Sequence, residues 1–362
     1  MKQLTIVSLM ALSLSLAACG GSGGSGLNSV ASAPPPIPSA NTTPTTPPPT
    51  VVSATVTRSP LPDSLANQTG TYDTIAISRG GMVEPAGAVR LAVDNTAKTY
   101  SLTFQPGVSA LASIQFAFPA DFGVKIDTLT KYSDGTSNTG TQFSTTAFAK
   151  TEIIQGTGKK IVASLQDGSL YYPAPAQYVT LGSWNLDPQE QASGGSYLST
   201  GKQTGGSFVY GIRTIPADIP VTGKASYTVS EDSREDYNDY SLLYAPYSNT
   251  KLNVDFAART IAALFQYSGH FEAGAIPVAV QASGISAISV GGDFNILLSG
   301  SATASSAIPT TSPVSGLFAG AFFGPQATEI GGVYSIPIVS WDGKNILTSN
   351  VQGAFTAARS SP

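Results

Sequence analysis

The sequence predicts an all-β protein, in which an N-terminal β-rich subdomain precedes an antiparallel barrel or sandwich. Gly is plentiful, at 37 of 362 residues, and Tyr and Phe contribute 15 each. Only 11% of the residues are charged, and helices draw on Leu, Glu, Lys and Arg, so this composition favours short strands joined by turns. Several segments also alternate apolar and polar residues, which is the period of a half-buried strand.

The first subdomain is expected over residues 58–180. Its strand patterns lie at residues 88–93, 100–104 and 114–118. Residues 131–140 have the composition of a polar turn, and residues 171–178 that of a loop punctuated by Pro.

The second region, residues 181–362, has strand patterns at closer spacing. They lie at residues 207–213, 223–229, 252–256, 260–267, 286–290, 293–299, 316–323, 332–339 and 351–356. About eight antiparallel strands predict a barrel or a sandwich, and Gly within strands suits the bends of a small barrel. A membrane-spanning barrel shows the same alternation. The anchor signal, the tether and a last strand without an aromatic end favour a barrel outside the bilayer.

The N-terminus is organised like a bacterial lipoprotein signal. Lys2 precedes an apolar stretch over residues 4–18, which ends in Leu16-Ala17-Ala18-Cys19. This ending resembles the lipobox, where the signal is cut before a Cys whose thiol carries diacylglycerol. We expect a signal peptide over residues 1–18 and a membrane anchor on Cys19, because each buried CH₂ contributes about 0.8 kcal/mol. An ordinary secretory signal with a chance Cys is the alternative.

Residues 19–57 are expected to comprise the lipidated Cys and a disordered tether. The segment from Gly20 to Thr57 has no charged residue, begins with Gly and Ser, and continues into Pro runs. Such a chain is coil and polyproline II, and it cannot bury enough apolar surface to fold. By resemblance to other lipoproteins, the absence of Asp at position 20 implies sorting to the outer membrane, and we expect display at the cell surface.

The counts of Cys, His and charged residues exclude several classes of function. One Cys and one His cannot form an intrachain disulfide or a zinc site of three or four such ligands. A catalytic triad would depend on His270, and the folded region has no nucleophile motif. We therefore expect neither an enzyme nor a metal site. The net charge of -4 argues against nucleic acid as a partner.

The most specific segment is Gly-Ala-Phe-Phe-Gly-Pro-Gln-Ala-Thr-Glu-Ile-Gly-Gly-Val-Tyr, at residues 320–334. The two Phe should end one strand, because the following Gly-Pro pair breaks the ladder. Residues 326–329 make the connection, with room for one helical turn. The Gly-Gly pair then permits positive φ or a close backbone approach. The signature residues are Gly320, Phe322, Phe323, Gly324, Pro325, Glu329, Gly331 and Gly332.

This segment resembles the closing hairpin of the barrel in transferrin-binding protein B-like lipoproteins. Residues 220–227 and 252–256 fit the same barrel. The resemblance implies an eight-stranded antiparallel β-barrel over residues 181–362, preceded by a handle-like subdomain over residues 58–180. The chain has room for one handle-and-barrel lobe, which favours the shorter, solute-binding branch of the family.

The same resemblance implies a surface lipoprotein of iron acquisition. Its ligand would be haem or an iron- or haem-carrying protein, from a host or the environment. Its other partners would be a TonB-dependent receptor and a surface lipoprotein translocon. The alternative is a structural or adhesin-type interaction lipoprotein with no small-molecule ligand.

Two stretches supply candidate ligand-binding residues. His270 lies between strand patterns and has the imidazole that an axial haem ligand needs, although a solvent-facing turn residue is the commoner case. Residues 231–247 mix five acidic side chains with Tyr237, Tyr240 and Tyr244. This mixture suits a protein interface. A solvated loop and a calcium site are the alternatives, and the spacing lacks the EF-hand order.

Overall fold

The computed structural model of the protein describes residues 70–78, 82–85, 87–94, 96–109, 111–122, 127–131, 137–141, 148–154, 158–167, 176–191, 197–200, 202–234, 242–243, 250–271, 276–304, 310–341 and 346–360. The expected signal peptide, Cys19 and the tether lie outside this set. Strands dominate the described residues, and the helical segments are two short 3-10 turns, η3 (Pro216–Asp218) and η5 (Pro325–Ala327). Neither turn approaches the length of an apolar helix that could cross a bilayer, and the described residues contain no such helix.

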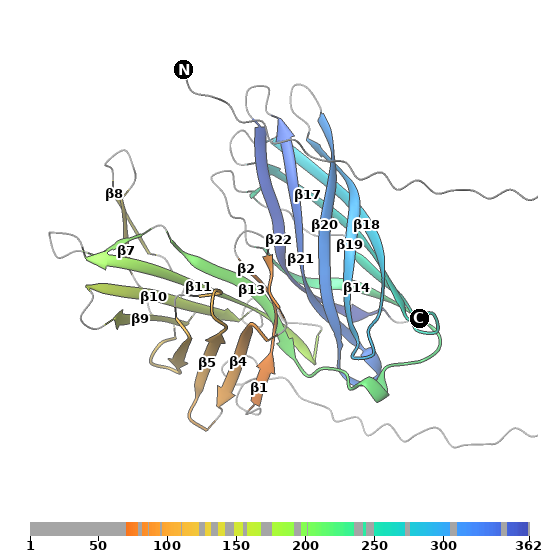
Figure 1. Cartoon of the computed structure of the whole chain (residues 1–362), viewed down its shortest axis with the longest axis horizontal. Helices are drawn as coiled ribbons and strands as arrows, with labels where there is room; N and C mark the ends of the chain where they lie inside the picture. The colour runs from red at the N-terminus through yellow and green to blue at the C-terminus, as the bar shows by residue number, and fades with distance from the viewer. Residues whose placement is uncertain are drawn as a thin grey trace, which may run out of the picture. The chain divides into compact units, whose positions relative to one another are not determined.

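The first region contains two antiparallel sheets and a hairpin (Figure 1). One sheet has the order β1-β4-β5-β6, with bounds Gly70–Asp73, Val89–Asp94, Thr99–Phe104 and Ser113–Ala117. The other has the order β3-β2-β13-β11-β10-β9, with β12 added on β11. Its strands are β2 (Ile75–Ser78), β3 (Met82–Val83), β9 (Phe148–Ile154), β10 (Lys159–Asp167), β11 (Val179–Gln191), β12 (Tyr197–Ser199) and β13 (Thr204–Gly211). The hairpin joins β7 (Asp127–Lys131) to β8 (Ser137–Thr141).

The core of this region lies between the apolar faces of the two sheets. β4 buries Val89, Leu91 and Val93 and leaves the alternate residues exposed or half-buried, as the period of a strand requires. These side chains join one apolar cluster with Phe148 and Trp184 from the seven-stranded sheet. The strands expected near residues 88–93, 100–104 and 114–118 are therefore confirmed as β4, β5 and β6.

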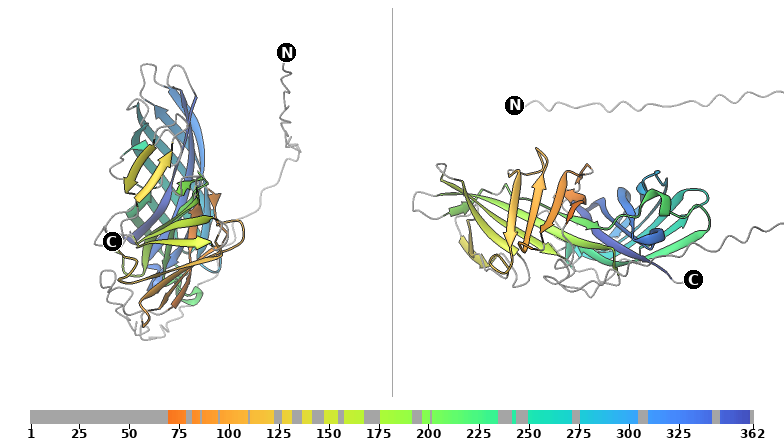
Figure 2. Two further views of the ribbon diagram at one scale, coloured as in Figure 1. Left: turned by 90° about the vertical axis from the view of Figure 1, so that its left-hand side faces the viewer. Right: turned by 90° about the horizontal axis from the view of Figure 1, so that it is seen from below.

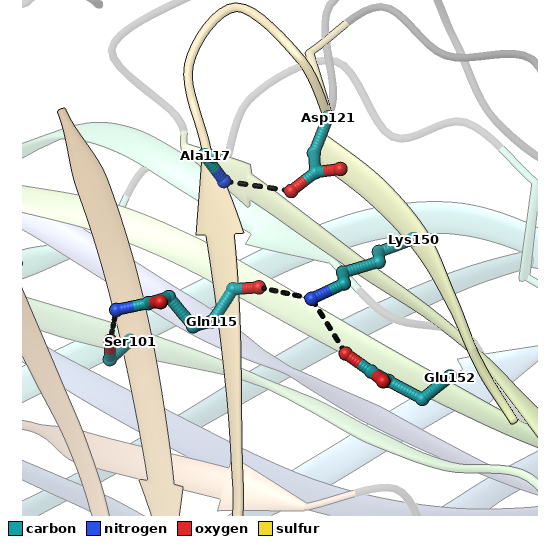
Figure 3. A network of polar contacts seen from close by, with 6 residues as sticks. All are labelled: Ser101, Gln115, Ala117, Asp121, Lys150 and Glu152. Carbon is teal, nitrogen blue, oxygen red and sulfur yellow. Dashed lines mark hydrogen bonds and ion pairs between the residues drawn. The ribbon is translucent and has the colours of Figure 1, made fainter.

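A polar network links the edges of the two sheets (Figure 3). Lys150 of β9 donates from Nζ to the Gln115 carbonyl of β6 at 3.2 Å and pairs with Glu152 at 2.6 Å. The side-chain amide of Gln115 in turn donates from Nε2 to Ser101 Oγ on β5 at 3.2 Å. Charged side chains at a strand edge discourage pairing with other chains, so the network both joins the sheets and protects their edges.

The second region is a closed barrel of eight antiparallel strands (Figures 1 and 2). The order around it is β17-β16-β14-β22-β21-β20-β19-β18, and β18 pairs with β17 to close the ring. The strands are β14 (Lys224–Arg234), β16 (Lys251–Asp255), β17 (Thr260–Phe271), β18 (Ile276–Ala287), β19 (Asp293–Ala304), β20 (Thr310–Phe323), β21 (Glu329–Trp341) and β22 (Ile346–Arg359). The short β15 (Leu242–Leu243) pairs with the end of β17, beyond the part of β17 that pairs with β16. The predicted all-β fold class and the eight-stranded barrel are confirmed.

Apolar side chains fill the barrel interior. The rings of Phe318 and Phe355 lie 4.3 Å apart between centroids, and those of Phe265 and Tyr334 lie 5.3 Å apart. These four rings belong to one buried cluster that draws on every barrel strand. Outward positions of the described strand residues are mostly small or polar. The described part of the barrel interior is therefore an apolar core.

The division between the two regions falls later than residue 180. β11 and β13 pair with β10 and β2, so both belong to the seven-stranded sheet. The change of sheet falls between Gly211 and Lys224. The pattern at residues 207–213 correctly indicated a strand, but alternation does not identify the partner of a strand.

Two smaller expectations were wrong. Residues 286–290 were expected to form a strand, but β18 ends at Ala287 and the chain then turns before β19. Residues 131–140 were expected to be a turn, but they include parts of β7 and β8.

Candidate functional site

The barrel has two ends of different construction. Strands stop or start at Arg234, Phe271, Ala304 and Trp341 at one end, which we name the loop end. The opposite end has tight connections at residues 256–259, 288–292 and 324–328, and we name it the turn end. We name residues 231–247 the Tyr-rich segment. It continues beyond Arg234, and His270 precedes Phe271, so both candidate stretches belong to the loop end.

Strand β15 brings the two candidate stretches together. Its residues Leu242 and Leu243 follow Tyr240 and precede Tyr244 in the sequence, and they pair with Phe271 and His270 of β17. His270 also pairs with Pro277 of β18. His270 therefore lies within a strand and not in a turn, contrary to the commoner case stated above. Tyr237, Tyr240 and Tyr244 themselves lie outside the described residues.

The Tyr-rich segment begins within a strand, because β14 continues to Arg234. Glu231 and Asp232 are part of β14 and pair with Thr356 and Phe355 of β22. A bulge separates Glu231 from Val229, and a bulge bends a strand locally. The first four of residues 231–247 therefore lie in strand β14.

The signature segment lies at the turn end. Phe323 ends β20 and Pro325 begins a short helical turn, η5, as the sequence predicts, whereas β21 already begins at Glu329, which was expected in the connection. Gly324 has φ +73° and ψ 174°, a conformation that is essentially restricted to glycine. Gly331 supports a close approach, since a Cβ there would lie 2.5 Å from Val179 Cγ2 of β11.

Glu329 connects the barrel to the first region. Its side chain is buried, at 4% exposure. The carboxylate accepts hydrogen bonds from three successive backbone N–H groups, those of Gln177, Tyr178 (2.8 Å) and Val179 (3.0 Å). Charged acceptors make strong hydrogen bonds to backbone N–H groups. The Glu of the signature thus holds the start of β11, which sequence reasoning missed because the partner lies 150 residues away.

Tyr227 connects the first barrel strand to the signature. Its hydroxyl is buried and donates to the Ala327 carbonyl at 2.5 Å. Burial raises the pKa of this hydroxyl above its ordinary value, so it remains a donor at neutral pH. The hydrogen bond fixes η5 against β14 and closes the turn end.

The surface offers a shallow groove of about 910 Å³ on the outer wall near the turn end. Lys224, Asp255 and Arg359 supply its charged groups, and Ala262 and Ile285 its apolar part. No group of three or more His, Cys, Asp or Glu side chains suited to a metal ion occurs among the described residues.

A protein-family model matches the barrel. Residues 219–359 match the model described as the C-lobe and N-lobe beta barrels of Tf-binding protein B. No curated protein sequence matches. A double mutant of transferrin binding protein B from Haemophilus parasuis Hp5 is 17% identical, with a TM-score of 0.29, over 79% of this chain and 53% of that one. This chain thus spans about half of that structure. The N-lobe domain of lactoferrin binding protein B from Moraxella bovis is 16% identical, with a TM-score of 0.28, over 54% of this chain and 79% of that one.

Proposed function

We propose that this chain, whose barrel matches the family model of transferrin-binding protein B barrels, is a surface-anchored protein that captures an iron-carrying protein. The observation that most supports the location of the site is the pairing of β15 with β17. It joins the Tyr-rich segment to the strand of His270. We assign ligand contact to this loop end, with His270, Tyr237, Tyr240 and Tyr244 as contact residues, and we assign no catalytic step.

A protein ligand suits this barrel better than a small molecule. The interior is packed with aromatic side chains, so a ligand has to bind outside it. Tyr supplies large contact area at a low cost in entropy, and acidic side chains steer a basic partner surface toward the site. Both residue types are concentrated between Arg234 and Thr250.

The N-terminal sequence supports attachment at the outer membrane. Lipid on Cys19 would anchor the chain, and the uncharged tether would hold the barrel away from the bilayer. A captured ligand then needs a route inward, for which a TonB-dependent receptor is the expected partner. A surface lipoprotein translocon would deliver the chain to the outside.

The test is direct binding by the full chain carrying Cys19→Ser, which prevents acylation. The protein is immobilised and titrated with transferrin, lactoferrin and haemoglobin. We expect one of them to bind, and replacement of Tyr237, Tyr240 and Tyr244 together by Ala to weaken binding by about tenfold or more. Tyr197→Ala, on β12 of the first region, is the matched control and should bind as the unmodified chain does.

Each of the other outcomes has a definite meaning. Binding that survives the triple replacement would move the site away from the loop end. No binding to any of the three proteins would reject the proposal and favour an adhesin-type lipoprotein. Direct haem capture is the second candidate, because β17 places His270 at the loop end. A saturable shift of the haem Soret band that disappears in His270→Ala would assign that function.

A further inference from the structure

Exposed aliphatic side chains gather at the turn end of the barrel. Nine large apolar side chains are exposed among the described residues, and three of these belong to the first region. The remaining six lie on β18, on β19, on the turn between them or on the linker that precedes β14. They are Ile212, Ile215, Val221, Ile285, Val290 and Leu297, and we name them the aliphatic surface. Val290 and Leu297 are 78% and 76% exposed.

Contacts between the linker and the β18–β19 turn hold these two segments side by side. Arg213 Nη1 lies 2.8 Å from Asp293 Oδ1. A Cβ on Gly292 would lie 2.8 Å from Ile219 Cδ1. Each exposed residue of the linker is within two positions of Arg213 or Ile219, and Val290 is two positions from Gly292.

The two strand residues of the aliphatic surface are neighbours across β18 and β19. The register pairs Ser283 with Ser299, and a Cβ on Gly284 would lie 2.1 Å from the Leu297 carbonyl oxygen, which places Ile285 near Leu297. Both side chains point outward, because Phe294, Ile296 and Leu298 fill the interior positions of β19. Exposed apolar side chains that gather in one part of a surface mark a candidate interaction site.

The charged groups around the aliphatic surface have partners within the chain. Arg213 pairs with Asp293 and Lys224 with Asp255. Arg259 donates to the Ser289 carbonyl at 2.5 Å. Asp218 accepts the Gln326 N–H, and Arg359 lies over the Phe256 ring. A partner therefore has no strong net charge to neutralise here, and an identical surface can approach without repulsion.

We propose that the aliphatic surface joins two copies of this chain through an isologous, two-fold contact. Its six side chains expose on the order of 700 Å² per copy, close to the roughly 800 Å² that each partner buries in a standard interface. An isologous contact requires a surface that complements itself, which a neutral aliphatic one does. A bilayer is a poor alternative, because surface-seeking segments use Trp, Phe and an excess of Lys and Arg.

Sedimentation of the full Cys19→Ser chain over a range of concentrations tests the proposal. We expect a reversible dimer. Val290→Lys combined with Leu297→Lys should weaken dimerisation by about tenfold or more, because the contact would then bury two pairs of like charges. Both positions are exposed in the single chain, so the monomer should stay folded. Met82→Lys, at an exposed apolar position in the first region, should dimerise as the parent does.

A chain that remains monomeric at every concentration would overturn the proposal. So would a dimer that tolerates the double Lys replacement. Neither result bears on ligand capture, because the aliphatic surface and the loop end lie at opposite ends of the barrel strands. A dimer formed at the turn end would leave both loop ends free.

Discussion

Among single residues, Asp255 shows most clearly how folding affects an ionisable group. It accepts a hydrogen bond from the Ala258 N–H at 3.0 Å and pairs with Lys224 at 3.0 Å. The Ala258 N–H, and then the Lys224 ammonium, lower the pKa of the Asp255 carboxyl below its ordinary value. A carboxyl with a lowered folded-state pKa stabilises the fold above its unfolded pKa, and this contribution is lost as pH falls through the folded value.

Asp255→Asn should therefore make stability less sensitive to acid. The measurement is the urea midpoint at about pH 7 and about pH 3, on either side of the ordinary aspartate range. Lys224→Met should give an intermediate result, because it removes the ion pair and keeps the Ala258 hydrogen bond. An Asp255→Asn chain with the same change in midpoint as the parent would contradict this account.

At the scale of elements, the β20–β21 connection depends on Gly324. Alanine there would adopt a conformation reserved for glycine, and its Cβ would lie 2.5 Å from both Thr328 Oγ1 and the Tyr178 ring. Gly223 is the matched control, because its φ is +86° and a Cβ there meets no atom within 4 Å. Gly223→Ala should cost about 1 kcal/mol of unfolding free energy, and Gly324→Ala about 3 kcal/mol or more. Equal losses in urea unfolding would show that crowding at Gly324 contributes nothing.

Local sequence patterns predicted where the strands lie better than they predicted which strands pair. Alternation located most barrel strands, because the side chains that fill the interior recur at every second position. It misassigned β13, whose neighbour β2 lies more than a hundred residues earlier. It also could not show that Glu329 binds residues 177–179, although Glu329 stands in the most recognisable segment. The pairing of His270 with β15 could not be predicted either, since it depends on how the connection between β14 and β16 folds back.

For the whole molecule, the first region and the barrel share one buried cluster. Val179, Leu181 and Val209 of the seven-stranded sheet pack with Phe323 and Val333 of the barrel. Shared burial of this kind couples the two regions, so we expect a single unfolding transition in calorimetry.

Glu329→Ala tests that coupling. It leaves three backbone N–H groups without their acceptor, and the buried one, that of Val179, costs about 1–3 kcal/mol. We expect the single transition to broaden or divide, and the amides of residues 177–179 to exchange hydrogen faster. Glu190→Ala, at an exposed ion pair on β11, is the control and should keep one transition. An unchanged melting profile in Glu329→Ala would mean that the apolar cluster alone couples the two regions.

The packed barrel interior has a consequence for how the chain can diversify. Among the described residues, the filling side chains come from the strands and the turn end. A doubling in the length of a flexible loop adds only about 0.6 kcal/mol to the entropy of closing it. We therefore expect insertions at the opposite end to cost little stability, so that the loops there can change in length and composition while the barrel beneath them stays the same.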